Sequence, residues 1–429
     1  MGSTMTAKIL AKASGQDLVR PGDAVLVKID LLTCVDAGPF IDELRARDLK
    51  VWDPERIIFC FDHIFQPDWM PIRAEIEHPR IKEFAREQGI PPQNIYDFGR
   101  NGISHQIPVE QGWAVPGAVC LGVDTQSSTM GAVNCFAMPV LNGSEPILIT
   151  GDIWMIVPEC VRINLTGRLP RGVNGKDVVY RLIADLGESV QGKVIEFSGP
   201  GVGSLPIDMR LAIANGSVQI GALTIIFPAD DHLIDYVSPR ARSAFNAVAA
   251  DDDAEYTATY DLDLSTLARL IAGPHEIDRV RTVDQLAGLD VTAAYIGSCS
   301  SGRLDDLALA AEVLRGRKIH PTVRLVVTPI SADTHRDAAR AGILQDLLEA
   351  GATVTQPGCG ACYKGNLSPL KLGRGERCIS TSVETLRGRM GSIDAEILLA
   401  NAAVVAASAI EGRVADPGPY LAGEVELQA

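Results

Sequence analysis

The hydrophobic positions of this chain fall into short runs that alternate with longer segments of helical periodicity. Runs rich in β-branched residues, such as "DAVLVKIDLL", "RIIFCFDH" and "TAAYIGSC", predict strands. Segments such as "PRIKEFAREQG" and "LDDLALAAEVLRG" repeat apolar residues at the spacing of a helix and end on glycine. Because strand and helix signals alternate, the pattern predicts an α/β fold with largely parallel sheets.

The chain of 429 residues is long enough for two or three domains. We predict three α/β domains, spanning residues 1–150, 151–275 and 276–429. The first ends near "PILITGD", and the second contains the glycine-rich "IEFSGPGVGSL" and the acidic stretch "AADDDAEYTATYDLDLS". The third carries "IGSCSSGR" and the turn "QPGCGACYKGN". The acidic stretch is expected on the surface.

The composition and net charge of the chain limit the kinds of molecule that it is expected to bind. With 46% hydrophobic and 22% charged residues the chain has the profile of a globular protein, and its formal charge of −15 opposes binding to phosphate backbones. No apolar run reaches the ~18–20 residues that span a bilayer, and the N-terminus lacks a signal-peptide pattern. We therefore expect a cytoplasmic protein that binds neither nucleic acid nor membrane.

Nine cysteines at irregular spacings argue against a disulfide framework. Most lie in apolar, strand-like segments, where a buried small side chain is the ordinary interpretation. Two glycine-containing loops, "GVNGKD" and "GPGVG", do not follow the phosphate-binding patterns, because the first lacks Ser or Thr after its lysine and the second lacks the dinucleotide spacing. Nucleotide binding at either loop is therefore not expected.

Cys359 and Cys362 stand three positions apart in a glycine-rich turn. A structural zinc site usually needs a second ligand pair, which the sequence lacks, and a redox pair usually lies early in a small βαβ domain. A site with three cysteine ligands remains, with Cys299 of "IGSCSSGR" as the best third candidate. Three thiolates can hold a cubane iron–sulfur cluster and leave one iron open to act as a Lewis acid.

These motifs, in order along nearly the whole chain, resemble the aconitase superfamily, and in particular the large subunits of the 3-isopropylmalate dehydratase type. The resemblance rests on "FDH" followed by "QP", "GISHQIPVEQGWAVPG", "VPECVRINLTGRLPRGVNGKDVV" and "VIEFSGPGV". It continues through "IGSCSSGRLDDL", "PGCGACYKGN" and "RCISTSVETLRGRMG". Together these segments imply three α/β domains of the aconitase type around a central cluster site.

The resemblance implies a [4Fe–4S] cluster whose open iron binds substrate while water is eliminated or added. Its metal ligands would be Cys299, Cys359 and Cys362. The implied catalytic residues are Asp62 and His63 near the leaving hydroxyl, His105 and Asp124 around the cluster, and Glu196 near the iron-bound water. Loss of a hydroxyl group needs a proton donor, and a histidine or carboxyl of suitable pKa meets that need.

Several positions depart from the family pattern. Gln126 stands where the family has a histidine, so any proton transfer by that residue is lost. Glu384 stands where the family has an arginine that pairs with a substrate carboxylate, while Arg389 is retained; the three are expected in the substrate pocket. We therefore expect a malate-like hydroxyacid of non-standard structure as substrate.

No segment of the chain matches the family's swivelling domain, so the resemblance implies a separate small subunit that completes the site. The expected function is the large catalytic subunit of an iron–sulfur hydro-lyase, a dehydratase or isomerase. The alternative is a cluster- or metal-binding homologue without hydro-lyase activity, in a regulatory or binding role.

Overall fold

The β-branched runs of the sequence form parallel sheets, as predicted. The computed structural model describes residues 2–66, 71–141 and 143–421. The chain divides into two compact units, each made of two chain segments. Unit 1 contains Met1–Arg168 and Leu186–Ser265, and unit 2 contains Leu169–Asp185 and Thr266–Ala429. The division into three domains stays a prediction.

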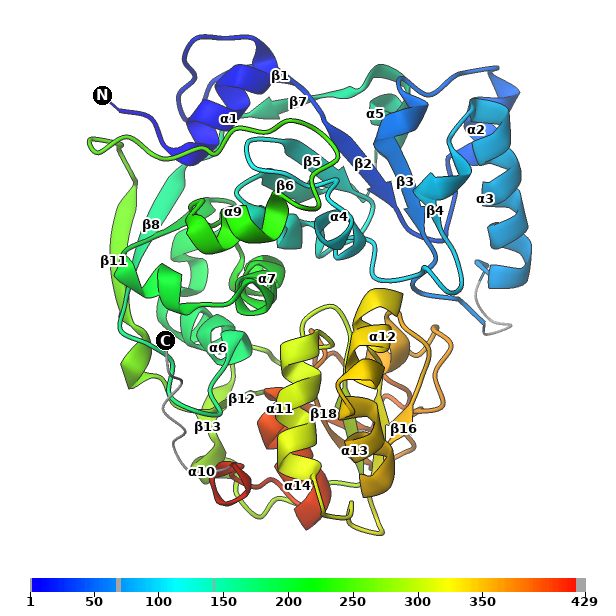
Figure 1. Cartoon of the computed structure of the whole chain (residues 1–429), viewed down its shortest axis with the longest axis vertical. Helices are drawn as coiled ribbons and strands as arrows, with labels where there is room; N and C mark the ends of the chain where they lie inside the picture. The colour runs from blue at the N-terminus through cyan, green and yellow to red at the C-terminus, as the bar shows by residue number, and fades with distance from the viewer. Residues whose placement is uncertain (1, 67–70, 142, 422–429) are drawn as a thin grey trace. The chain divides into compact units, whose positions relative to one another are not determined.

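Unit 1 contains a five-stranded parallel sheet in the order β4-β3-β2-β5-β6. Its strands are β2 (Leu31–Cys34), β3 (Ile57–Cys60), β4 (Ile95–Tyr96), β5 (Val119–Gly122) and β6 (Phe136–Pro139). Between them run α2 (Ile41–Ala46), α3 (Ala74–Gln88), α4 (Ile107–Glu110) and the 3-10 helix η3 (Ser127–Val133). In Figure 1, α2 and α3 lie beside β3 and β4. The chain moves outward from β2 to β4 and then returns to β5, so β2 and β5 flank a topological switch point.

Unit 1 also contains a four-stranded parallel sheet in the order β10-β9-β8-β11 and an antiparallel pair of strands. The parallel strands are β8 (Cys160–Thr166), β9 (Val194–Ser198), β10 (Thr224–Ile226) and β11 (Ala258–Asp263). The antiparallel pair is β1 (Ala24–Lys28) with β7 (Asp152–Ile156). The remaining α-helices of the unit are α1 (Met5–Ser14), α5 (Ser144–Thr150), α7 (Ile207–Asn215), α8 (Ser217–Ile220) and α9 (Asp231–Val237).

Unit 2 is built on a seven-stranded sheet in the order β13-β12-β18-β17-β14-β15-β16. Its strands are β12 (Leu270–Ala272), β13 (Val280–Thr282), β14 (Ala293–Ile296), β15 (Arg324–Val327), β16 (Thr353–Val354), β17 (Arg377–Ser380) and β18 (Glu396–Leu399). The five strands from β18 to β16 are parallel, and β12 pairs antiparallel with β18 and β13. A second switch point therefore lies between β14 and β17.

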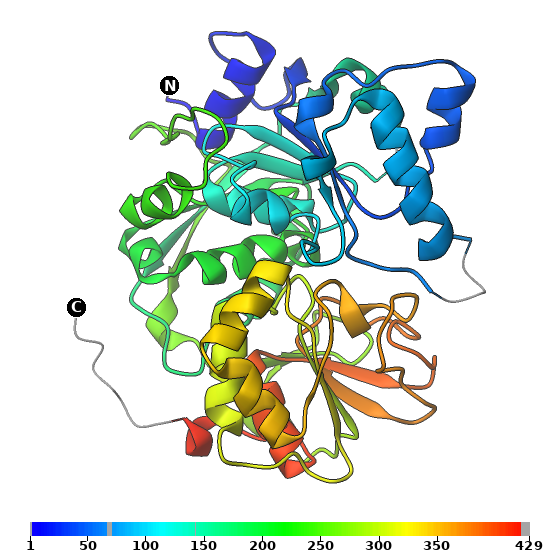
Figure 2. The same ribbon diagram turned by 45° about the vertical axis from the view of Figure 1, so that its right-hand side comes forward.

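The core of unit 2 lies between this sheet and its helices. The helices are α10 (Val283–Leu286), α11 (Leu304–Leu314), α12 (Ala332–Arg340), α13 (Ile343–Ala350) and α14 (Ala402–Glu411), with α6 (Gly175–Leu186) supplied by the earlier chain segment. Helix α14 is rich in alanine and buried along nearly its whole length, so α11 packs closely against it. Figure 2 shows α11 and α13, in yellow and gold, on one side of the orange and red strands.

Candidate active site

A cluster of carboxylates and a histidine lies at the carboxyl ends of three neighbouring strands in unit 1. Asp36 follows β2, Asp62 and His63 follow β3, and Asp124 follows β5. Because parallel strands end at the same edge of the sheet, the topology brings together residues that are far apart in sequence. The cluster therefore occupies the switch point between β2 and β5, where open α/β sheets bind their ligands.

His63 is the centre of this cluster. Its Nδ1 lies 2.8 Å from Oδ1 of Asp62 and 3.4 Å from Oδ1 of Asp36. Its Nε2 lies 3.7 Å from Oδ2 of Asp124. Burial lowers the pKa of His63, but the charge of Asp62 and the hydrogen bonds to Asp36 and Asp62 outweigh burial and raise that pKa well above its ordinary value. The imidazole therefore holds its proton at neutral pH, as a general acid must.

Asp62 faces His63 from a fully enclosed position. Its Oδ2 accepts a hydrogen bond from the backbone N–H of Ser104 at 2.9 Å, while its Oδ1 faces the imidazole. Burial raises the pKa of Asp62, although the charge of His63 opposes that rise. Both oxygens are thus engaged, so the carboxylate fixes the orientation of the histidine ring.

Asp36 belongs to the same cluster and was not among the predicted site residues. Its carboxylate accepts hydrogen bonds from the backbone N–H groups of His63 at 3.3 Å and Ile64 at 2.6 Å, and its Oδ2 lies 3.1 Å from Nε2 of His78. Burial raises its pKa, but the hydrogen bonds with His63 and His78 outweigh burial and hold that pKa below its ordinary value. A charged residue two positions after a buried strand was the signal in the sequence.

His105 and Gln126 lie at the edge of this cluster. His105 is buried, and its Nε2 lies 3.6 Å from Oδ1 of Asp124. The backbone N–H of Gln126 donates to the same Oδ1 at 2.9 Å. The side-chain Oε1 of Gln126 is buried and has no hydrogen-bond partner within the described part of the chain. Four of the five predicted catalytic residues, Asp62, His63, His105 and Asp124, are therefore brought together in unit 1.

Glu196, the fifth predicted catalytic residue, is placed among different partners. Its carboxylate accepts hydrogen bonds from the N–H groups of Met5 at 3.1 Å and Thr6 at 2.8 Å, in the first turn of α1. The hydroxyls of Thr6 and Tyr256 also donate to it, at 2.7 Å and 2.8 Å. These contacts suit a buried carboxylate that stabilises the positive end of a helix. These hydrogen bonds join Glu196 to α1 and Tyr256, and none of them involves the group of carboxylates around His63.

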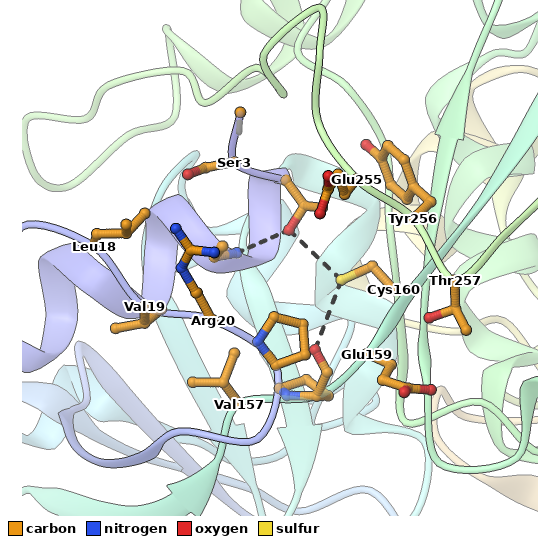
Figure 3. A pocket seen from close by; sticks show the side chains of 15 residues that line it. Ser3, Leu18, Val19, Arg20, Val157, Glu159, Cys160, Glu255, Tyr256 and Thr257 are labelled. Atoms are coloured by element: carbon orange, nitrogen blue, oxygen red, sulfur yellow. Dashed lines mark hydrogen bonds between the residues drawn. The ribbon is translucent and has the colours of Figure 1, made fainter.

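A pocket of about 280 Å³ is lined by Tyr256, which donates to this carboxylate. Cys160 and Tyr256 line it together with residues at the start of α1, as Figure 3 shows. Sγ of Cys160 lies 3.6 Å from Oγ1 of Thr4, and burial raises the pKa of the Cys160 thiol to about 12. The neutral thiol form is therefore favoured at this position.

The three predicted cysteine ligands are brought together in unit 2. Cys299 follows β14, whereas Cys359 and Cys362 lie in the turn after β16, and all three are buried. Ser298 links the two segments, because its hydroxyl lies 3.6 Å from Sγ of Cys299 and also hydrogen-bonds to Cys362. Cys359 in turn hydrogen-bonds to Cys362.

Glycine allows the turn to approach its neighbours closely. Gly360 lies between the two cysteines with φ of +56°, and a Cβ at that position would collide with the hydroxyl groups of Tyr295 and Thr328. The hydroxyl of Tyr295 donates to the carbonyl of Cys359 at 3.1 Å. The turn is thus held against β14 and the end of β15, where Cys299 also lies.

The groups around Cys362 favour the thiolate form of its side chain. The hydrogen bond from Cys359 and the positive charge of Arg389 hold the pKa of Cys362 well below its usual range, in spite of burial. Nη2 of Arg389 lies 3.7 Å from the sulfur, and its Nε donates to the carbonyl of Cys362 at 3.0 Å. Three buried thiols from two loops, one of them with a lowered pKa, match the donor set of a cubane iron–sulfur cluster.

Arg389 and Glu384, two of the predicted substrate residues, also lie in unit 2 and interact electrostatically. Burial lowers the pKa of Arg389, but the negative charges of Cys362, Cys359 and Glu384 raise it above its ordinary value. Glu384 therefore supplies a negative partner for Arg389 within the protein. Their roles in substrate binding stay predictions.

Lys176 is the second residue that sequence reasoning missed. It begins α6 within "GVNGKD", and its buried ammonium donates to Oγ of Ser300 and to the carbonyl of Ser382, each at 3.1 Å. Burial lowers the pKa of Lys176 to about 8. The segment was considered as a phosphate loop and as part of the family resemblance, and its distance from the cysteines along the chain gave no signal of this contact.

The family model of "Aconitase family (aconitate hydratase)" matches residues 8–412. The chain belongs to the aconitase family. It is 38% identical over 426 residues to the "3-isopropylmalate dehydratase large subunit 1" of Methanopyrus kandleri, which covers 98% of this chain and 100% of the relative. It is also 38% identical over 425 residues to the "2,3-dimethylmalate dehydratase large subunit" of Eubacterium barkeri, with 97% and 99% covered. Among solved structures, holo aconitase X of Thermococcus kodakaraensis matches 86% of this chain and 88% of its own, with a TM-score of 0.49 and 13% identity.

These findings confirm the predicted family, the α/β fold and the hydro-lyase class, because dehydratases are hydro-lyases. Dehydratases of this family use iron–sulfur clusters, and the relatives are named large subunits, which implies a separate small subunit. Within the described residues no helix is long and apolar enough to cross a membrane.

Proposed function

We propose that the chain is the large subunit of an iron–sulfur hydro-lyase that removes water from, or adds it to, a malate-like hydroxyacid. The observation that carries the proposal is the convergence of Cys299, Cys359 and Cys362 from separate segments of unit 2, with the pKa of Cys362 lowered. These residues would hold a [4Fe–4S] cluster. When bound, the cluster would supply an open iron that polarises the substrate hydroxyl.

The group of carboxylates and histidines at Asp36, Asp62, His63, His105 and Asp124 has the proton chemistry that such a reaction needs. His63 holds a proton that Asp62 and Asp36 stabilise, and a departing hydroxyl group needs such a proton. His105 and Asp124 border the same group and would fix the direction of transfer at Nε2 of His63. The role of Glu196 near an iron-bound water is part of the proposal, although its present partners belong to α1 and Tyr256.

Two residues support a substrate that differs from those of the standard enzymes. Glu384 places a negative charge beside Arg389, so a second substrate carboxylate would meet repulsion there. The buried Oε1 of Gln126 needs a hydrogen-bond donor, which a substrate hydroxyl or amide would supply. We therefore propose a hydroxyacid with a neutral or donating group in place of one carboxylate. The names of the relatives point to alkylated malates, so analogues of these acids with one carboxylate replaced are the class to examine first.

Anaerobic purification with iron and sulfide counting tests the cluster. We expect about four irons and four sulfides per chain, and loss of both in Cys359→Ser. Cys378→Ser is the matched control, because Cys378 is a buried thiol of the same unit whose pKa burial raises. Zinc alone, or no metal, in the unsubstituted protein would refute the proposal.

Turnover by the chain together with its small subunit tests the substrate. The panel contains isopropylmalate, citrate, methylmalates, 2,3-dimethylmalate and analogues with one carboxylate replaced. Efficient turnover of isopropylmalate or citrate would refute the altered specificity. A cluster-loaded complex inactive on every compound would favour a binding or regulatory homologue.

A further inference from the structure

Lys176 brings a positive charge into the interior of unit 2. Its side chain is 4% exposed, and it reaches the cysteine loops from α6, which belongs to an earlier chain segment than the rest of the unit. Its Nζ joins the loop after β14, through Ser300, to the segment after β17, through Ser382. Ser300 directly follows the cluster ligand Cys299.

The ammonium group has no carboxylate within 4 Å among the described residues. Its two hydrogen-bond acceptors, Ser300 and Ser382, are neutral, and its Nζ also lies 5.4 Å from the centre of the Tyr180 ring. The negative groups that attract it at longer range are Asp306, then the sulfurs of Cys299 and Cys362, and then Asp177. A buried cation without a direct carboxylate partner is costly unless another anion compensates it.

We propose that Lys176 is the charge partner of the thiolate cluster site and a positioning residue for the Cys299 loop. This inference rests on the proposed function, because the anion that Lys176 would compensate is the cluster with its three thiolates. Such a site is negative when oxidised and one unit more negative when reduced. A fixed positive charge nearby favours the reduced form and therefore raises the reduction potential.

The same charge favours metal binding by the cysteine ligands. A thiol that binds a metal ion does so as a thiolate, and Lys176 stabilises the negative charge that forms. Arg389 provides a second positive charge on the Cys362 side. The cysteine group is thus flanked by two cations from different parts of the unit.

The test compares three variants of Lys176 with a control. Lys176→Gln removes the charge and keeps a donor, Lys176→Met removes both, and Lys176→Arg keeps the charge. Lys371→Met is the control, because Lys371 also donates to two carbonyl groups near the cysteine turn, at 2.7 Å each, without reaching a sulfur. All variants are reconstituted anaerobically, and the midpoint potential of the cluster is measured by EPR-monitored titration.

We expect a more negative midpoint potential for Lys176→Gln and Lys176→Met, and an unchanged one for Lys176→Arg and Lys371→Met. In the apo proteins, Co²⁺ affinity from thiolate-to-cobalt absorption should fall about tenfold in the two neutral variants. Unchanged potential and unchanged Co²⁺ affinity would overturn the inference. So would unfolding of both neutral variants, which would make the role structural only.

The two proposals fail in different ways. If the unsubstituted protein takes up no iron but Co²⁺ affinity still depends on Lys176, the proposed function is wrong and the charge partnership stands. If the cluster forms and neither readout depends on Lys176, the proposed function stands and this inference is wrong.

Discussion

Replacing Asp62 by Asn would lower the pKa of His63 by an amount that the geometry allows us to estimate. The hydrogen bond between Oδ1 of Asp62 and Nδ1 of His63 is 2.8 Å long and joins two buried groups. Hydrogen bonds to charged groups are worth about 1.5–3 kcal/mol, and each pKa unit corresponds to ~1.4 kcal/mol. We therefore expect the pKa of His63 to fall by about 1–2 units.

Asp124→Asn is the matched control for this change. Its Oδ2 lies 3.7 Å from Nε2 of His63, beyond hydrogen-bonding distance, and its side chain is 17% exposed. Solvent and distance weaken the interaction, so the pKa of His63 should fall by less than about one unit in this variant. Asp62→Asn should also cost about 1–3 kcal/mol of stability, since an amide cannot accept from both Ser104 and His63.

The assay follows the ring C–H resonances of selectively labelled histidines by NMR between pH 5 and 10. The chain has seven histidines, and His63→Gln identifies the resonance by its disappearance. Because the folded pKa of His63 is raised, its contribution to stability is present below pH 6.5 and is lost as pH rises through the folded value. An equal or larger fall of the pKa in Asp124→Asn than in Asp62→Asn would refute the reasoning.

Three further predictions concern stability. Burial raises the pKa of Asp177 to about 6 from 3.8, so stability should fall by roughly 3 kcal/mol as pH rises from 4 to 7. Asp177→Asn should abolish that slope in urea unfolding, and a retained slope would contradict this origin. Gly360→Ala should cost about 2–4 kcal/mol in thermal unfolding, because its Cβ would collide with Tyr295; an unchanged Tm would contradict the clash. Arg210→Met should lower the free energy of unfolding by about 3 kcal/mol, because it leaves the Asp230 carboxylate without its arginine partner. Adding Asp230→Asn should recover part of that loss, and no recovery would contradict the coupling of the pair.

The sequence predicted the site best where the contacts are local or follow from strand order. Cys359 and Cys362 are close because one turn holds them. Asp62, His63 and Asp124 converge because their strands are parallel neighbours, and the same logic would have found Asp36 once the end of β2 was recognised. Alternating strand and helix signals were likewise enough for the α/β fold.

Other contacts could not be predicted from the sequence. Glu196 accepts hydrogen bonds from α1, about 190 residues away along the chain, and from Tyr256, and no motif indicated that pairing. Lys176 meets the cysteine loops only because residues 169–185 fold with the C-terminal unit. Contacts of this kind depend on packing between elements that are remote in sequence, and hydrophobic periodicity carries no information about them.

The interleaving of the two units also constrains how the protein is made. Helix α6 leaves the ribosome before the second segment of unit 1 and before every strand of unit 2. It cannot bury its apolar face in unit 2 until the later segment has been synthesised, so the nascent chain carries an unpartnered helix while unit 1 forms. A truncated fragment beginning at Thr266 would lack Lys176 altogether. The cysteine site therefore combines a segment that is synthesised early with segments that are synthesised late, and it can form only after the C-terminal segment has been made.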